Sequence, residues 1–245
     1  MSNRVRGAAA PARWDRQAAR PASGFMPRAK LAERVAADIE TQIIRNRWPT
    51  GHVIGSEAQL LESYGVSRAI LREAIRILEH QSIAAMRKGP GGGLVVSEPS
   101  AAVVSRAIAV YFRHRRVDPA QLVEVRAALE ASVLRLVHAK MTPELARQLR
   151  HHLDVDEGPT SHHGMHHFHL MLAAMTGNPG IELFAQCLVM LTDINVTEAA
   201  PREGDARLHG AHVEVADALI RGDLERAIAA MTEHIHALEK FMRTQ

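Results

Sequence analysis

The chain of 245 residues carries a net charge of +3 and is 47% apolar and 23% charged, an ordinary globular balance that excludes a disordered or fibrous chain. No apolar run reaches the roughly 18–20 residues that span a bilayer, and the arginines near the N-terminus are not followed by the apolar segment of a secretory signal. Cys187 is the only cysteine, which excludes an internal disulfide and a cysteine-based zinc finger, and we expect a cytoplasmic protein without membrane contact.

The chain begins with a segment that has no periodic pattern. Residues 1–26 are rich in Ala, Arg, Pro, Ser and Gly, so we interpret them as a mobile basic tail. Its arginines could touch DNA phosphates, but a solvated tail is the simpler interpretation. Residues 27–47 then repeat apolar side chains at helical spacing, which predicts a first helix.

Two short helices are predicted next, each with its own start signal. Residues 56–59 read Ser-Glu-Ala-Gln, a candidate capping box for a second helix that ends at Gly65. Ser67 can cap a third helix over residues 68–80. The buried stripe of this third helix is predicted to be Leu71, Ala74, Ile75 and Leu78.

A β-hairpin is predicted after the third helix. Residues 83–86 and 94–96 are short and apolar, and residues 87–93 between them form a basic, glycine-rich tip. Three helices followed by a two-stranded hairpin predict a winged helix-turn-helix domain. The glycines of the tip also resemble a phosphate-cradling loop, but a Walker-type lysine and a following helix are missing from the required order.

The remainder of the chain shows only helical signals. Asp118-Pro119 and Thr142-Pro143 each place a cap before a proline in the first turn, and Gly177 and Gly222 separate later helices. Residues 154–163 are polar and predict a loop. The expected helices cover residues 101–115, 118–139, 142–153, 164–176, 179–197, 204–221 and 223–243.

Charge and histidine content also divide the chain. Residues 1–100 contain 15 lysines and arginines and 9 acidic residues, whereas residues 101–245 contain 15 and 18. Of the 15 histidines, 11 lie between His151 and His236. We therefore predict a mostly α fold with a basic winged helix-turn-helix DNA-binding domain at residues 27–98. An all-α helical bundle is predicted at residues 99–245.

The third predicted helix carries the side chains of a DNA reader. Arg68 and Arg72 are four residues apart and share a face, which Arg76 continues, and arginine suits bidentate contact with guanine. The alternative interpretation is an arginine face that is only solvated. The order of helix caps, turn and wing along the chain favours DNA binding. The residues predicted to contact DNA are Ser56, Ser67, Arg68, Arg72, Arg76, Arg87, Lys88 and Gly89.

Three histidines can converge in the predicted bundle. His212 lies ten residues before Gly222 and His234 twelve after it, so an antiparallel hairpin places them at nearly the same level. His169 lies on another helix, and three imidazoles suit zinc or a similar divalent ion. For a single histidine, a surface or hydrogen-bonded role is the simpler interpretation. We keep that interpretation for His151, His152, His162, His163 and His236.

The N-terminal motifs resemble those of the GntR family of bacterial transcription regulators. The resemblance covers residues 28–97 and rests on Ile54-Gly55-Ser56-Glu57, Tyr64-Gly65-Val66-Ser67-Arg68, Leu71-Arg72-Glu73-Ala74-Ile75 and Gly89-Pro90-Gly91-Gly92-Gly93. The family usually has an arginine that contacts DNA where this chain has Ala58, so one expected contact is missing. The matching arginines Arg68 and Arg72 remain.

Residues 101–245 resemble the FCD effector domain of the FadR-like branch of this family. The similar segments are Val125–Glu130, Phe168-His169, Thr176–Pro179, His212, Ala218–Asp223 and His234-Ile235. The resemblance implies that His169, His212 and His234, with an aspartate, hold a divalent metal that helps to bind a small carboxylate. Met165 occupies the aspartate's position, and His162 and His166 are candidate substitutes. Arg126 is the candidate carboxylate anchor, with an ion pair to Glu130 as the equal alternative.

The sequence thus predicts a DNA-binding transcriptional regulator and not an enzyme. We expect a homodimeric repressor that binds a pseudo-palindromic operator and responds to a small organic acid, with activation as the alternative mode. One rival is a metal-dependent hydrolase that uses the three histidines, although no His-Glu-x-x-His motif exists and Glu233 would point from a face of the helix next to that of His234. The other rival is a nucleoid-type DNA binder without an effector.

Overall fold

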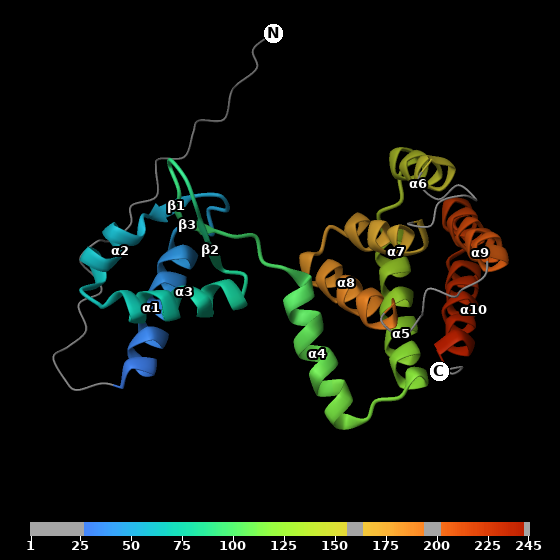
Figure 1. Cartoon of the computed structure of the whole chain (residues 1–245). Coiled ribbons are helices and arrows are strands. Elements are labelled where there is room, and N and C mark those ends of the chain that lie inside the picture. The colour runs from blue at the N-terminus through green and yellow to red at the C-terminus, as the bar shows by residue number, and fades with distance from the viewer. Residues whose placement is uncertain (1–26, 156–163, 194–201, 243–245) are drawn as a thin grey trace, which may run out of the picture. The chain divides into compact units, whose positions relative to one another are not determined.

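The computed structural model describes residues 27–155, 164–193 and 202–242, and the chain divides after Val103 into two compact units (Figure 1). The predicted tail, residues 1–26, lies outside the described residues. The elements are α1 (Arg28–Arg45), β1 (Val53–Gly55), α2 (Glu57–Tyr64), α3 (Arg68–His80), β2 (Ala84–Arg87), β3 (Gly93–Val96), α4 (Ala101–Arg115), α5 (Pro119–Ala139), α6 (Pro143–Val155), α7 (Gly164–Met175), α8 (Pro179–Asp193), α9 (Arg202–Arg221) and α10 (Leu224–Met242). The predicted mostly α class is confirmed.

The N-terminal unit is built on the packing of α1 against α3. Their apolar stripes form its core, in which Ile39, Ile43, Leu71 and Leu78 are fully buried. The same residues that predicted the helices by their spacing therefore hold them together. Burying one such side chain contributes about 1.5–3 kcal/mol.

The sheet of this unit has three strands, not the two of the predicted hairpin. β2 pairs antiparallel with β3, with Ala84 opposite Val96, and β1 pairs with the other edge of β3, with Val53 opposite Val95. β1 is only three residues long and ends in glycine, so alternation over so few residues does not signal a strand. The predicted hairpin of β2 and β3 is confirmed, and β1 joins it as a third strand that the sequence did not predict.

Local chemistry fixes the turn that separates α2 from α3. Ser56, which is half-buried, forms the predicted capping box with Gln59 at the start of α2. Gly65 ends α2 in the left-handed region at φ +60°, which glycine adopts without strain. The Ser67 hydroxyl oxygen accepts a hydrogen bond from the Ile70 N–H at the start of α3. Caps on both helices thus set where α3 begins.

The C-terminal unit is an all-α bundle arranged around α5. α5 packs against α7, α8 and α10, and α9 and α10 pack against each other as a pair joined at Gly222 (Figure 1). Asp118 and Gln121 form a capping box before Pro119, as the sequence predicts for this start. α8 is described only to Asp193, so the last four residues of the predicted helix 179–197 lie outside the described part. No helix in the described ranges is long and apolar enough to cross a membrane.

Candidate DNA interface and histidine centre

The outward face of α3 carries the arginines that the sequence proposes for base contact. Ser67, Arg68, Arg72 and Arg76 are exposed, while the opposite stripe of the helix is buried. The Ser67 hydroxyl oxygen accepts the Ile70 N–H, so its own hydrogen is available to a phosphate oxygen. The N-terminal part of α3 therefore presents a basic, solvent-facing surface, the arrangement with which helix-turn-helix domains enter the major groove.

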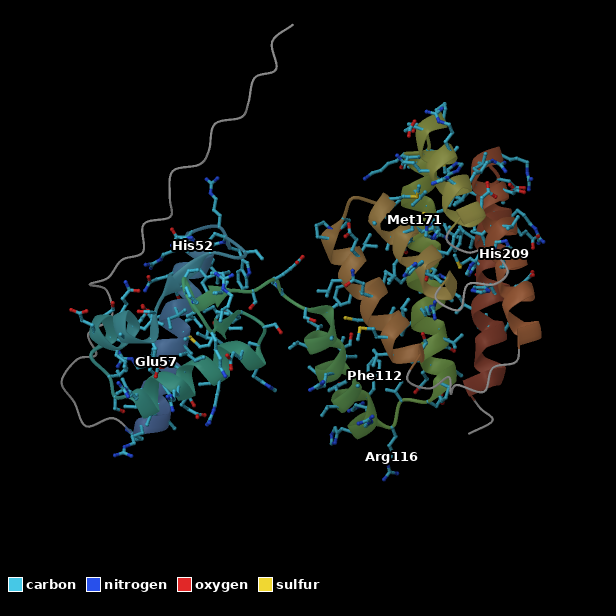
Figure 2. The ribbon with its side chains drawn as sticks, turned by 45° about the horizontal axis from the view of Figure 1, so that its top comes forward. His52, Glu57, Phe112, Arg116, Met171 and His209 are labelled. Carbon is cyan, nitrogen blue, oxygen red and sulfur yellow. The ribbon has the colours of Figure 1, made fainter. Side chains whose placement is uncertain are left out.

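Two of these arginines contact carboxylates. Arg72 Nε lies 3.4 Å from Oε1 of Glu57, which lies at the start of α2 (Figure 2), and Arg76 Nη1 lies 3.3 Å from Glu73 Oε2. Both pairs are solvent-exposed, and pairs of this kind contribute about 0.2–1 kcal/mol. DNA can therefore displace either carboxylate at small cost. Arg68 has no ion-pair partner within the described ranges.

The wing places its basic residues in solvent. Arg87 is the last residue of β2, opposite Gly93, rather than part of the turn in which the sequence places it. Its guanidinium donates a hydrogen bond to the Gly91 carbonyl. Lys88 and Gly89 follow in the turn, and both are exposed. The wing can thus bring two positive charges to a DNA backbone.

Three buried histidines converge in the C-terminal unit. His169 of α7, His212 of α9 and His234 of α10 are 1%, 1% and 6% exposed. His234 Nε2 lies 3.2 Å from His169 Nε2 and 3.1 Å from His212 Nε2. The structure therefore brings together the three histidines that the sequence selected. Within the described ranges, no other group of three metal-ligating side chains comes this close.

Helix pairing explains the convergence. α9 and α10 are joined at Gly222, so His212 and His234 reach the same level, and their ring centroids are 4.6 Å apart. Phe168 is fully buried and stacks on the His212 ring with a centroid distance of 4.4 Å. Phe168 is the neighbour of His169 on α7, so this helix supplies one histidine of the centre and also packs against the ring of His212.

The two nitrogen separations at His234 fit a shared metal ion. Two nitrogens at zinc-bond distance lie about 2.9 Å apart at a right angle and about 3.3 Å apart at the tetrahedral angle, and the observed separations are 3.1 and 3.2 Å. A neutral imidazole nitrogen has one in-plane site, either an N–H or a lone pair. His234 Nε2 can therefore make a well-aligned hydrogen bond with only one of its two neighbours, whereas a metal accepts one lone pair from each ring.

A buried arginine and a buried glutamate lie beside the centre. Arg126 and Glu130 of α5 are 1% and 2% exposed, and Arg126 Nε lies 3.8 Å from Glu130 Oε1. Arg126 also donates from Nη1 to Thr192 Oγ1 of α8 at 2.7 Å. Burial raises the pKa of Glu130 to about 7, although the charges of Arg126 and His212 partly oppose that rise. The ion pair considered from the sequence is thus present, and Arg126 is fully enclosed.

Sequence reasoning missed two contacts of this site. Glu130 Oε1 lies 2.8 Å from His169 Nδ1, and Thr192 binds Arg126 across the bundle. The spacing of Glu130 from Arg126 was visible in the sequence, but no spacing links α5 to α7 or α8. These contacts depend on how the helices pack.

The side chains that the sequence offers in place of the missing aspartate lie outside the described part of the chain. His162 and His163 lie outside the described residues, and so do the side chains of Met165 and His166. His151 and His236 are exposed and His152 is half-buried. The described donors are therefore three imidazole nitrogens, a set that suits zinc and other borderline divalent ions.

Comparison with known proteins agrees with both units. Residues 31–94 match the model of the bacterial regulatory proteins of the gntR family, and residues 121–237 match the FCD domain. The HTH-type transcriptional repressors NanR of Enterobacter sp. (strain 638) and Cronobacter sakazakii are 25% and 26% identical to the chain, covering 87% of it and 85% of each relative.

The fold also resembles a solved regulator. The Streptococcus agalactiae GntR structure has a TM-score of 0.59 and 23% identity, and the match covers 85% of this chain and 99% of that one. At this identity the likeness concerns the fold alone. The two domain models together extend over most of the chain, in the order DNA-binding domain and then FCD domain. The chain therefore belongs to the GntR family of bacterial regulatory proteins, with a C-terminal FCD domain, and is a DNA-binding transcriptional regulator.

Proposed function

We propose that this regulator is a homodimeric repressor whose operator affinity is controlled by a small organic acid bound in the C-terminal bundle. The similar NanR proteins are named transcriptional repressors, which supports repression over activation. A dimer places two recognition helices on the two half-sites of a pseudo-palindromic operator.

We assign DNA binding to residues 27–98, and we assign effector binding and dimerisation to residues 99–245. In the DNA-binding part, Arg68, Arg72 and Arg76 contact base edges or phosphates from α3, and Ser67 binds a phosphate. The wing residues Arg87, Lys88 and Gly89 approach the DNA backbone or the minor groove. Ser56, at the start of α2, is a further proposed DNA contact. The exposure of the arginines on one face of α3 supports these roles.

The observation that carries the effector proposal is the convergence of three histidine Nε2 atoms beside a buried arginine. His169, His212 and His234 would hold a divalent metal, which would supply a Lewis-acid site for a carboxylate. Arg126 would add a guanidinium fork, which matches a carboxylate bidentately. Because Arg126 contacts both Thr192 and Glu130, the ligand has to share this guanidinium with them.

The regulatory step we propose is a population shift. The acid binds more tightly to the arrangement of the dimer whose recognition helices do not match the half-site spacing. It can weaken DNA binding only by the difference between its affinities for the two arrangements. A tenfold loss of operator affinity requires a difference of about 1.4 kcal/mol.

The test starts with DNA selected by the protein from a random pool. Fluorescence anisotropy with this DNA is measured for the zinc-loaded protein against a panel of mono-, di- and hydroxycarboxylic acids. We expect one chemical class to lower DNA affinity at least tenfold, and H212A to lose that response while keeping its affinity for DNA. Binding that never responds, with little sequence preference and a steep salt dependence, would support the nucleoid-type alternative.

Glu233 does not supply the general base that the hydrolase alternative requires. Glu233, the acidic neighbour of His234, is exposed, whereas His234 is buried. A general base has to lie within hydrogen-bond reach of the metal-bound water. Turnover of an ester or phosphoester panel that H212A abolishes would revive this alternative.

A further inference from the structure

One carboxylate lies inside the C-terminal unit next to the histidine centre. Glu130 is the only buried acidic side chain in the part of the chain that the structure describes. Its Oε1 atom lies 2.8 Å from His169 Nδ1 and 3.8 Å from Arg126 Nε. The two nitrogens of His169 therefore face different partners, with Nδ1 toward Glu130 and Nε2 toward His234.

This orientation determines which nitrogen of His169 can bind a metal. A neutral imidazole carries its proton on one nitrogen and a lone pair on the other, and a carboxylate acceptor keeps the proton on the nitrogen that it faces. With Glu130 Oε1 at 2.8 Å, the proton is favoured on Nδ1, and this leaves the Nε2 lone pair on the side of His234.

Glu130 also supplies charge that the three ligands lack. Three neutral imidazoles leave the full charge of a divalent ion uncompensated. The Arg126 guanidinium adds a further positive charge beside the site. In a buried region, where charges are weakly screened, one carboxylate near the centre therefore favours occupancy strongly.

We propose that Glu130 is the positioning residue of the metal centre, orienting His169 through Nδ1 and providing a negative charge that the three imidazoles lack. This inference rests on the metal-binding part of the proposed function. It assigns Glu130 a role toward the metal, and not only the role of an ion-pair partner for Arg126. The two roles predict different effects when either residue of that pair is neutralised.

The test measures the zinc affinity of the full chain by competition with a chromophoric chelator. E130Q keeps an acceptor oxygen and loses the charge, so we expect about a tenfold weaker affinity, and up to about 100-fold for E130A, which loses both. R126Q should change the affinity in the opposite direction, because it removes a positive charge beside the ion. E124Q is the matched control, since Glu124 is an exposed glutamate on the same helix, and it should bind zinc as the unchanged protein does.

Two further measurements keep the inference open to refutation. Cobalt-loaded E130Q should show altered visible d–d bands, and nitrogen NMR of the unchanged zinc-loaded protein should show His169 protonated at Nδ1 and metal-bound at Nε2. A protein that binds no zinc would overturn the proposed metal site itself. Three other results would overturn only the role of Glu130 in a protein that does bind zinc. The first is a zinc affinity of E130Q equal to that of E124Q, and the second is an equal loss of zinc affinity in E130Q and R126Q. The third is a His169 that binds the metal through Nδ1.

Discussion

Nε of Arg72 lies 3.4 Å from Oε1 of Glu57, so the second helix of the DNA-binding unit holds an arginine on the outward face of the third. Glu57 lies directly before Ala58, the position at which the resemblance in sequence leads us to expect a DNA-contacting arginine. The contact orients Arg72 without burying it, because its side chain remains 66% exposed. Arg72 therefore remains available for base contact on a surface that lacks the neighbouring arginine.

Arg72→Ala should weaken binding to the selected DNA by about 1–3 kcal/mol, and less on random DNA, because a bidentate contact with guanine discriminates between bases. Anisotropy titrations on both DNAs measure the difference. Glu57→Ala is the matched control: it removes the ion pair but keeps the arginine, so its effect should stay below about 1 kcal/mol. Equal losses on the two DNAs for Arg72→Ala would show that this arginine contacts only phosphate.

His212→Ala should reduce zinc content from about one ion per chain to a small fraction, because two imidazoles bind a divalent ion far more weakly than three. Mass spectrometry of protein dialysed against trace zinc measures the content. Affinity for the selected DNA should stay within about twofold, since the residues that we propose for DNA contact lie in the other unit. His151→Ala, at an exposed histidine, is the control and should keep its zinc. A collapse of DNA binding in H212A would show that the histidine is structural.

The sequence predicted the parts of this protein that depend on local chemistry. The capping box at Ser56, the cap at Asp118 and the helix end at Gly65 are in place, because each requires only residues within one turn. The meeting of His212 with His234 was also predictable, because the two helices are joined by a short turn at Gly222. In each case the spacing along one helix or one hairpin determines the geometry.

What the sequence did not predict depends on packing between elements distant in the chain. The contact of Thr192 with Arg126 and of Glu130 with His169 joins separate helices, and no sequence spacing specifies it. The strand β1 was not predicted for a related reason. Its three residues form a strand only because they pair with an edge of β3. Such features follow from the assembled core.

Gly93→Ala should destabilise the wing by about 1–3 kcal/mol or more, because the backbone is held where an L side chain is both strained and obstructed. Gly93 has φ +149°, and a Cβ there would lie 2.4 Å from the Gly55 carbonyl oxygen of β1. Gly91→Ala is the matched control, with φ +71° and open space, so it should lose only about 1 kcal/mol from left-handed strain. Urea unfolding measures both, and equal losses would contradict the predicted obstruction.

Tyr64 should make the stability of the DNA-binding unit fall at alkaline pH. Its hydroxyl donates to Asp38 Oδ2 and accepts from Gln42 Nε2, and burial followed by the nearby Asp38 charge raises its pKa well above the ordinary value. An unfolded tyrosine ionises near pH 10, whereas the folded one keeps its proton. The folded state thus binds more protons above that pH, so its stability falls by about 1.4 kcal/mol per pH unit.

Urea unfolding at intervals between pH 9 and 11 measures this dependence. Tyr64→Phe should remove that part of the slope, and it should also lower stability below pH 9, because Asp38 and Gln42 lose a buried partner. Tyr111→Phe is the matched control, since Tyr111 is the other tyrosine of the chain and is 59% exposed. The same alkaline slope in Y64F as in the unchanged protein would show that Tyr64 does not keep its proton in the folded state.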